Sequence, residues 1–204
     1  AVEQASRTML ANHRINRALI VGSDHFSLIQ DPEDELSYSC FGDLSVAVIL
    51  EKTEEDTGFI DAIHYIDSTE PDVMSFPHQG LSNLLNNRSA YPYMKWTPFQ
   101  GENAYPYVCE SIQELLNDYG LSSQNIKCCF SQSNRTFIEK VQEDLGFLKE
   151  NSIFVGDRFG YPGTSSPFLA LHEGIENGTI QRGDYVLFWT VGTGYEFITM
   201  LFKY

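Results

Sequence analysis

Residues 156 to 171 read Gly-Asp-Arg-Phe-Gly-Tyr-Pro-Gly-Thr-Ser-Ser-Pro-Phe-Leu-Ala-Leu and combine turn chemistry with the start of a helix. Gly160 and Gly163 permit tight or left-handed backbone. The hydroxyl residues that follow can accept hydrogen bonds from the free N–H groups of a helix start. Pro167 fits a first helical turn, where its missing N–H costs nothing. The stretch therefore predicts a loop that leads into a helix, with small residues where a ligand or backbone comes close.

Outside this stretch, short apolar runs alternate with amphipathic segments. Short apolar runs between turn signals are typical of buried strands, and apolar residues three or four positions apart are typical of helices. We expect strands at 17–24, 58–68, 126–131, 184–191 and 195–203, a turn followed by a second buried strand at 39–51, and helices at 1–12, 104–119, 134–145 and 167–177. The strand at 17–24 should be buried and of the parallel type. The alternation predicts an α/β fold.

A long segment at 70–103, rich in proline and aromatic residues, interrupts this alternation. We expect an irregular excursion there. Long loops of this kind are often lids or substrate walls. The plainer alternative is that the segment wraps the core.

The composition is that of an ordinary globular protein with a large excess of acid. The chain has 204 residues, with 28 Asp and Glu against 13 Lys and Arg, and a formal net charge of −15. Nucleic acid and anionic membrane surfaces are disfavoured as partners, because phosphate binding needs clustered cations. No apolar run approaches the roughly 20 residues that span a bilayer, and no signal peptide is evident. We expect a cytoplasmic protein.

The four cysteines, Cys40, Cys109, Cys128 and Cys129, form no C-x-x-C pair. Buried free thiols in a reducing compartment are the simplest interpretation. Cys128 and Cys129 are adjacent on an expected strand, so their side chains should point to opposite faces. No cluster of His, Cys or Asp has metal-ligand spacing, and no metal site is predicted.

The stretch at 156–171 resembles the segment that carries the active-site Asn in the β-ketoacyl-ACP synthase III family of thiolase-fold condensing enzymes. Further similar segments follow the family order: Ala-Leu-Ile-Val-Gly-Ser-Asp at 18–24, Phe-Gly-Asp at 41–43, Phe-Gln-Gly at 99–101, Phe-Ser-Gln-Ser-Asn at 130–134, the residues at 177–184 and Gly-Thr-Gly at 192–194. Leu44 departs from the pattern, since the family has Gly there.

The resemblance implies a thiolase-like fold with layers in the order αβαβα. This chain would then hold the end of the N-terminal half at 1–57. The C-terminal half would follow at 58–204, with the excursion at 70–103 as a loop insertion. Alone, such a chain should expose sheet edges and a broad apolar face.

Two departures from the family pattern bear on function. In the family, a Cys takes up the acyl group, while a His and an Asn support decarboxylation and stabilise the developing negative charge. The register places that Cys a few residues before Ala1, and puts Ser131 at the His position and Tyr161 at the Asn position. Serine cannot titrate near neutral pH as histidine does. The tyrosine ring should fill or narrow the pocket.

The resemblance implies a set of acyl-pocket candidates: Asn134, Phe159, Gly160, Tyr161, Gly192 and Gly194. Asn134 has a plainer role as a helix N-cap, and the glycine pair has one as a tight hairpin. Cys128 and Cys129 lack the helix dipole that lowers a thiol pKa, so neither is favoured as a nucleophile. His78 and His172 are the best candidates for a general base outside the family positions, although the simpler interpretation of each is a surface histidine.

Three functions are consistent with these residues. The first is a degenerate ketosynthase-like subunit in fatty-acid or polyketide-type biosynthesis, inactive by itself, that shapes an acyl pocket or supports a partner. The second is the C-terminal piece of a split or cleaved acyltransferase whose Cys lies on another chain. The third is a stand-alone binding module. The first two imply a second polypeptide, either the N-terminal thiolase half or a ketosynthase. They imply an acyl-CoA or acyl-carrier-protein thioester as substrate and no cofactor.

Overall fold

The computed structural model describes residues 1–69, 71–97, 101–192 and 196–204. Its helices are α1 (Val2–Ala11), α2 (Glu35–Cys40), α3 (Leu81–Asn86), α4 (Tyr105–Asp118), α5 (Arg135–Asp144), α6 (Gly156–Phe159) and α7 (Ser166–Glu176). Its strands are β1 (Arg17–Asp24), β2 (Leu44–Glu51), β3 (Gly58–Ile66), β4 (Met74–Ser75), β5 (Lys95–Trp96), β6 (Ile126–Phe130), β7 (Tyr185–Gly192) and β8 (Glu196–Lys203). Most of the expected elements from 58 onward are confirmed.

The main sheet has four strands in the order β3-β8-β7-β6, with β6 and β7 parallel and the other pairs antiparallel. Apolar side chains leave both faces of it. One face packs with α4 and α5, and the other packs with α7. Cys128 lies in the first core cluster and Cys129 in the second, which confirms their opposite directions. Sheets covered on both faces bury strands that are apolar throughout.

Strands β1 and β2 form a separate antiparallel ribbon in which exposure alternates along each strand. Leu19 pairs with Ile49, and Val21 pairs with Ala47, on its outer face. The expectation of a buried parallel strand at 17–24 is therefore wrong. Its apolar run is continuous because both faces of the ribbon carry apolar residues, although only the inner face packs on the core.

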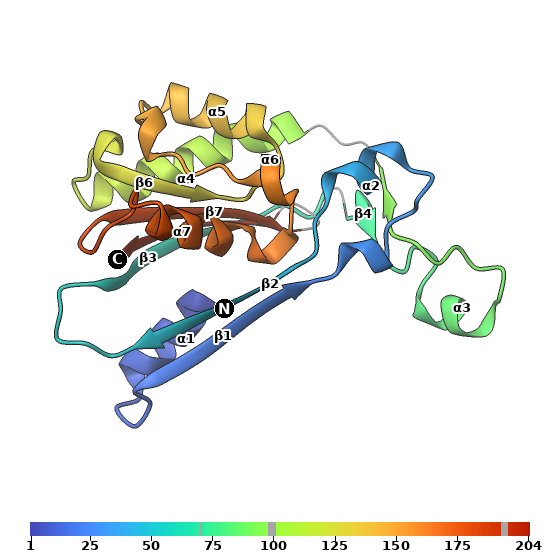
Figure 1. Ribbon diagram of the computed structural model, residues 1–204, viewed down its shortest axis with the longest axis horizontal. Coiled ribbons are helices and arrows are strands. Elements are labelled where there is room, and N and C mark those ends of the chain that lie inside the picture. The colour runs from blue at the N-terminus through green and yellow to red at the C-terminus, as the bar shows by residue number, and fades with distance from the viewer. Residues whose placement is uncertain (70, 98–100, 193–195) are drawn as a thin grey trace.

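The layers follow one another as helix, sheet, helix and ribbon (Figure 1). Helices α4 and α5 cover one face of the main sheet, and α7 covers the other face, on the side of the ribbon (Figure 1). Helix α1 contacts both β1 and β3, so it joins the ribbon to the main sheet. None of the helices in the described ranges has the length and apolar character that a membrane crossing needs.

Two expectations near the ribbon are corrected. The segment expected to be a turn before the second strand forms α2, because Asp34 accepts hydrogen bonds from Ser37 N (3.4 Å) and Ser37 Oγ (2.8 Å) at the helix start. The excursion at 70–103 is not wholly irregular, since it contains β4, α3 and β5. Met94 N donates to Ile29 O at 2.6 Å, and this hydrogen bond joins the excursion to the segment after β1.

The four cysteines are free, but only two of them are buried. Cys40 is exposed at the end of α2, and Cys109 is half-buried on α4. The expectation of four buried thiols is therefore wrong for these two. Apolar spacing alone does not separate a thiol on the core side of a short helix from one on its solvent side.

Candidate functional site

The loop between α6 and α7 lies directly against the segment that leads into β2. Gly160 has φ +69°, and a Cβ there would lie 3.1 Å from Gly42 N. A Cβ on Gly42 would lie 2.0 Å from Phe159 O, which no side chain can tolerate. The two glycines let the segments touch, and Tyr161 N donates to Cys40 O at 2.8 Å. Gly42 N donates to Tyr161 O at 3.1 Å, so the Tyr161 backbone is held on both sides.

Ser131 follows directly after β6 and is fully buried, with 0% of its surface exposed. Its backbone N donates to Trp189 O on β7 at 2.7 Å, which continues the ladder of the sheet by one bond. Its Oγ has no hydrogen-bond partner of normal geometry among the described residues. Buried hydroxyl groups without a partner are uncommon, because they lose their hydrogen bonds to water without replacement.

The Tyr161 side chain is half-buried. Burial raises the pKa of the Tyr161 hydroxyl, the nearby Ser131 hydroxyl lowers it, and the negative charge of Asp24 raises it again. The Ser131 hydroxyl thus influences that of Tyr161, although Ser131 Oγ has no hydrogen-bond partner of normal geometry among the described residues. The net rise in pKa keeps Tyr161 a neutral phenol that can donate a hydrogen bond.

Aromatic rings form the wall around Tyr161. Its ring centroid lies 5.5 Å from that of Phe41. Phe41 in turn lies 4.5 Å from Phe26 and 5.3 Å from Trp96, which comes from β5 in the excursion. Part of the excursion thus belongs to the surroundings of the site. The surroundings of the Tyr161 ring are therefore largely aromatic and apolar.

Asp24 brings a negative charge to this loop. Its Oδ2 accepts hydrogen bonds from Ser165 N and Ser165 Oγ, both at 3.2 Å. A Cβ on Gly163 would lie 3.2 Å from the Asp24 carboxyl carbon and 2.7 Å from the Phe26 ring, so this glycine is required by close approach. From the sequence, Asp24 is predicted only to end a strand. The signal that could have marked it as part of a site is a carboxylate placed directly after an apolar strand.

Gln132 has a buried side chain that supports the segment at the start of α6. Its Oε1 accepts from Val155 N at 2.7 Å and from Gly156 N at 3.1 Å. Its Nε2 donates to Phe130 O at 2.7 Å and to Ile153 O at 3.3 Å. Every polar capacity of the amide is directed at backbone, so Gln132 positions the start of α6 and is itself not free to bind a ligand.

Of the remaining pocket candidates that the structure describes, Asn134 caps a helix, and Phe159 and Gly192 are exposed. Asn134 is the N-cap of α5 and accepts from Phe137 N at 3.0 Å, which confirms its plainer role. Phe159 is 37% exposed, with the Arg158 guanidinium 4.6 Å from its ring centroid. Gly192 is exposed at the end of β7. Gly194 lies outside the described residues.

None of the histidines, all of which the structure describes, hydrogen-bonds to Ser131 or Tyr161. His78 contacts Ser75 Oγ at 2.9 Å, and His172 is exposed on α7. His25, which the sequence did not single out, lies 3.2 Å from an Asp43 carboxylate that also accepts from Ser27. The titratable groups of these side chains therefore serve surface contacts.

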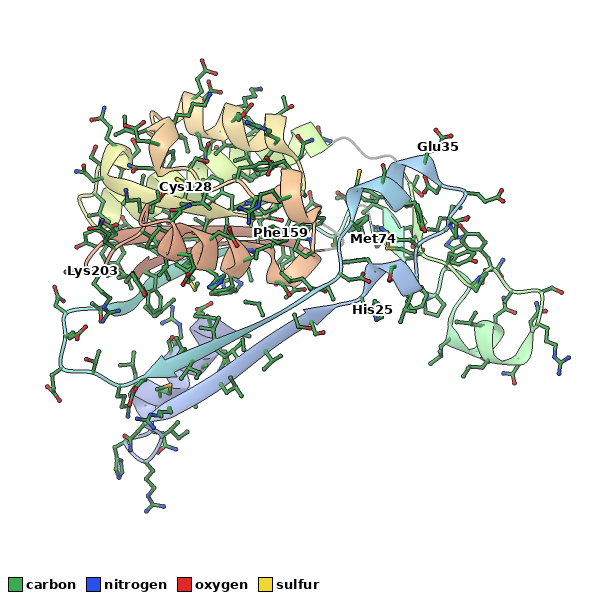
Figure 2. All side chains as sticks on the ribbon, in the orientation of Figure 1. His25, Glu35, Met74, Cys128, Phe159 and Lys203 are labelled. Carbon is green, nitrogen blue, oxygen red and sulfur yellow. The ribbon has the colours of Figure 1, made fainter. Side chains whose placement is uncertain are left out.

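The adjacent thiols are also unsuited to nucleophilic chemistry. Burial raises the pKa of Cys128 and of Cys129. A thiol must ionise to attack, so both are inert at neutral pH. Figure 2 shows Cys128 within the layer formed by the main sheet and its helices, whereas His25 and Phe159 lie where this layer meets the ribbon and the excursion.

The layers of helix, sheet, helix and ribbon, with the loop before α7 packed against the segment that leads into β2, define a thiolase-fold protein. A solved 3-oxoacyl-[acyl-carrier-protein] synthase III from Aquifex aeolicus superposes with a TM-score of 0.82 at 20% identity, covering 100% of this chain and 63% of that chain. One from Pseudomonas aeruginosa gives 0.85 at 20% identity, with the same coverage of 100% and 63%. The likeness to these structures establishes the fold.

Sequence comparison identifies the family. A family model described as 3-oxoacyl-[acyl-carrier-protein (ACP)] synthase III matches residues 1–68, and its C-terminal counterpart matches residues 116–204. The β-ketoacyl-[acyl-carrier-protein] synthase III of Solibacter usitatus is 27% identical over 205 residues, covering 96% of this chain and 61% of that protein. The chain belongs to the β-ketoacyl-ACP synthase III family. It spans about three-fifths of the length of such relatives.

Proposed function

We propose that this chain is part of a ketoacyl-synthase-III-like assembly in fatty-acid or polyketide-type biosynthesis that handles acyl thioesters without decarboxylative condensation. The observation that carries the proposal is the pair of hydroxyls at Ser131 and Tyr161, where the family resemblance implies His and Asn. The chain would be degenerate by itself, and would shape an acyl pocket or support an active partner.

The physical argument concerns the charge that decarboxylation creates. Loss of CO₂ from a malonyl thioester leaves an enolate, which the enzyme must stabilise with donors aimed at the developing oxyanion. A buried imidazole and an amide can supply two such donors. Ser131 supplies a hydroxyl without a titrating nitrogen, and Tyr161 supplies a large ring where the family has a small amide. Without the imidazole and the amide, we expect the barrier to decarboxylation to stay high.

Release of labelled CO₂ from malonyl-acyl-carrier protein tests this proposal. The full protein, with any polypeptide that co-purifies, should release no more CO₂ than buffer. The double substitution Ser131→His and Tyr161→Asn should raise the release on the order of 100-fold, the usual contribution of a placed acid–base group. Ser133→His, two residues away on the exposed side, is the matched control. Rapid CO₂ release by the unchanged protein would contradict the proposal.

We infer further that a second polypeptide, carrying the N-terminal thiolase half and its Cys or belonging to a ketosynthase, accompanies this chain. The support is the exposed outer face of the ribbon, where Leu19, Val21 and Ile49 are 66%, 62% and 69% exposed. Native and denaturing mass spectrometry should find two components. A clean monomer near 23.2 kDa would favour a stand-alone binding module instead.

A split acyltransferase is the second candidate. The observation in its favour is that the loop remains fully supported by Gln132, Gly42 and Asp24, which is unexpected if the site had lost all use. It would transfer an acyl group from a partner's Cys to an acceptor without condensation. Intact-mass detection of acylation on the partner, after incubation with an acyl thioester, would favour it over a non-catalytic subunit.

A further inference from the structure

A cavity of about 430 Å³ lies between the ribbon and the main sheet. Its mouth is at the end of the layers where β2 turns into β3, on the left of Figure 1. Neither Ser131 nor Tyr161 lines it, so it is separate from the candidate site in the loop before α7. Apolar side chains of three layers form its walls: Val48 and Leu50 of β2, Phe168 and Leu171 of α7, and Phe188 and Met200 of the main sheet.

The walls leave room for a ligand with a hydrocarbon body. Leu50, Phe168 and Leu171 pack against the core and are nevertheless only half-buried, because the cavity opens between them. The Phe168 and Phe188 rings stack with 5.1 Å between their centroids, which ties α7 to the main sheet beside the cavity. The volume is within the range of about 300–1,000 Å³ that is usual for small-molecule sites. Cavities with apolar walls take up apolar groups readily.

Charged side chains at the mouth constrain the other end of the ligand. Two acids and two cations line it: Glu51, Lys52, Glu55 and Arg182. Both acids already have a cationic partner, because Glu51 lies 2.6 Å from Arg17 and Glu55 pairs with Arg182. Neither carboxylate is therefore an unpaired negative charge that would repel an anion.

Lys52 has a positive charge that the fold leaves without a countercharge. Its Nζ donates to the backbone carbonyl of Asn12 at 3.0 Å and forms no ion pair with a carboxylate in the described ranges. The chain as a whole has a net charge of −15, so a surplus cation beside an apolar cavity is a local exception. It favours a ligand with one negative charge at the mouth.

We propose that this cavity binds a small organic monoanion with an apolar body, an aliphatic or aromatic carboxylate. The hydrocarbon part lies between β2 and α7, and the carboxylate stays at the water-exposed mouth beside Lys52. This arrangement buries apolar surface without burying charge. An amphiphile with a cationic head would meet the like charge of Lys52. The inference does not depend on the proposed function, since the two sites share no residue.

Three probes with the same hydrocarbon chain isolate the effect of the head group. Octanoate, octan-1-ol and octylamine carry a negative, a neutral and a positive head at neutral pH. Calorimetric titration of the protein, with any polypeptide that co-purifies, should give an affinity for octanoate at least about tenfold higher than for octylamine, with octan-1-ol between them. Equal affinities for octanoate and octylamine, or no detectable binding of octanoate, would overturn the proposal.

A substitution that fills the cavity tests the location of the site. Val48→Phe places a ring in the cavity and should weaken octanoate binding at least about tenfold. Ala47→Phe is the matched control, because successive strand residues point to opposite faces and Ala47 is exposed on the outer face of the ribbon. Thermal melting verifies that both variants are folded. Octanoate binding that survives Val48→Phe unchanged would place the ligand elsewhere.

A second substitution tests the charge without touching the walls. Lys52→Gln should weaken octanoate binding about fivefold, the size expected of a solvent-exposed ion pair, and leave octan-1-ol binding unchanged. Lys149→Gln removes an exposed cation that does not line the cavity and should change neither affinity. Equal effects of the two substitutions would overturn the role of Lys52. The CO₂-release assay judges the proposed function separately, so either result can fail while the other stands.

Discussion

At the scale of single residues, Gln132 is the side chain on which the site loop depends most. It satisfies two N–H groups and two carbonyls of other residues while it is only 3% exposed. Gln132→Leu keeps the approximate volume and leaves Val155 N and Gly156 N without this acceptor. Each orphaned buried group costs about 1–3 kcal/mol, so for the two N–H groups we expect about 2–6 kcal/mol of lost unfolding free energy.

Chemical denaturation of the variant and the parent protein measures this loss. Ser133→Ala is the matched control, since the side chain is an exposed neighbour and should change stability by less than about 0.5 kcal/mol. If Gln132→Leu matched that control, the four hydrogen bonds would not be holding the start of α6.

The sequence located Ser131 and Tyr161 because a resemblance fixes positions by spacing along the chain. It did not reveal Gln132 or Asp24 as parts of the site. Their importance comes from hydrogen bonds to residues more than twenty positions away, such as Val155 and Ser165. Spacing within one segment carries no information about such partners, so only the folded chain shows them.

At the scale of elements, the docking of α1 on the main sheet should depend on pH. Glu3 on α1 contacts His64 Nε2 on β3 at 2.6 Å and Arg7 Nε at 2.8 Å. The hydrogen bond with His64 is the main cause that holds the pKa of Glu3 below its ordinary value, with burial opposing it. A carboxyl with a lowered folded pKa stabilises the fold above its unfolded pKa, about 4.3.

This stabilisation should be lost as the pH falls from about 4.3 through the lower folded pKa. The partners are partly exposed, so its size should be at most about 1 kcal/mol. Glu3→Gln should flatten the stability curve in this acid range and leave the curve at higher pH parallel to that of the parent. Glu33→Gln, an exposed acid on the loop before α2, serves as control. Parallel curves for Glu3→Gln throughout would contradict the prediction.

Elements were predictable where one face is apolar and the other polar. Helix α4 follows this rule through Val108, Ile112 and Leu115, all buried. The sequence failed at β1, whose outer residues are apolar and yet exposed. The hydrophobic pattern indicates that a side chain favours burial. It does not indicate whether another part of this chain covers that side chain.

At the scale of the whole molecule, the outer face of the ribbon is apolar, and none of the described layers covers it. Leu19, Val21 and Ile49 stand together on it, opposite the side that packs toward α7 (Figure 1). Each large apolar side chain gains about 1.5–3 kcal/mol on full burial. A face of this kind, on strands with unpaired edges, favours association with another polypeptide.

We therefore expect Leu19→Thr combined with Ile49→Thr to weaken association, either with a co-purifying polypeptide or between copies of the chain. Threonine retains a strand preference, so the ribbon should persist while its outer face becomes polar. Leu85→Thr on α3 removes an equally exposed leucine far from the ribbon (Leu85 is 74% exposed) and should have no effect. Sedimentation velocity over a range of concentrations measures the change. If both variants associated equally, the outer face of the ribbon would not be the contact surface. The fold would then be stable with this apolar face exposed to solvent.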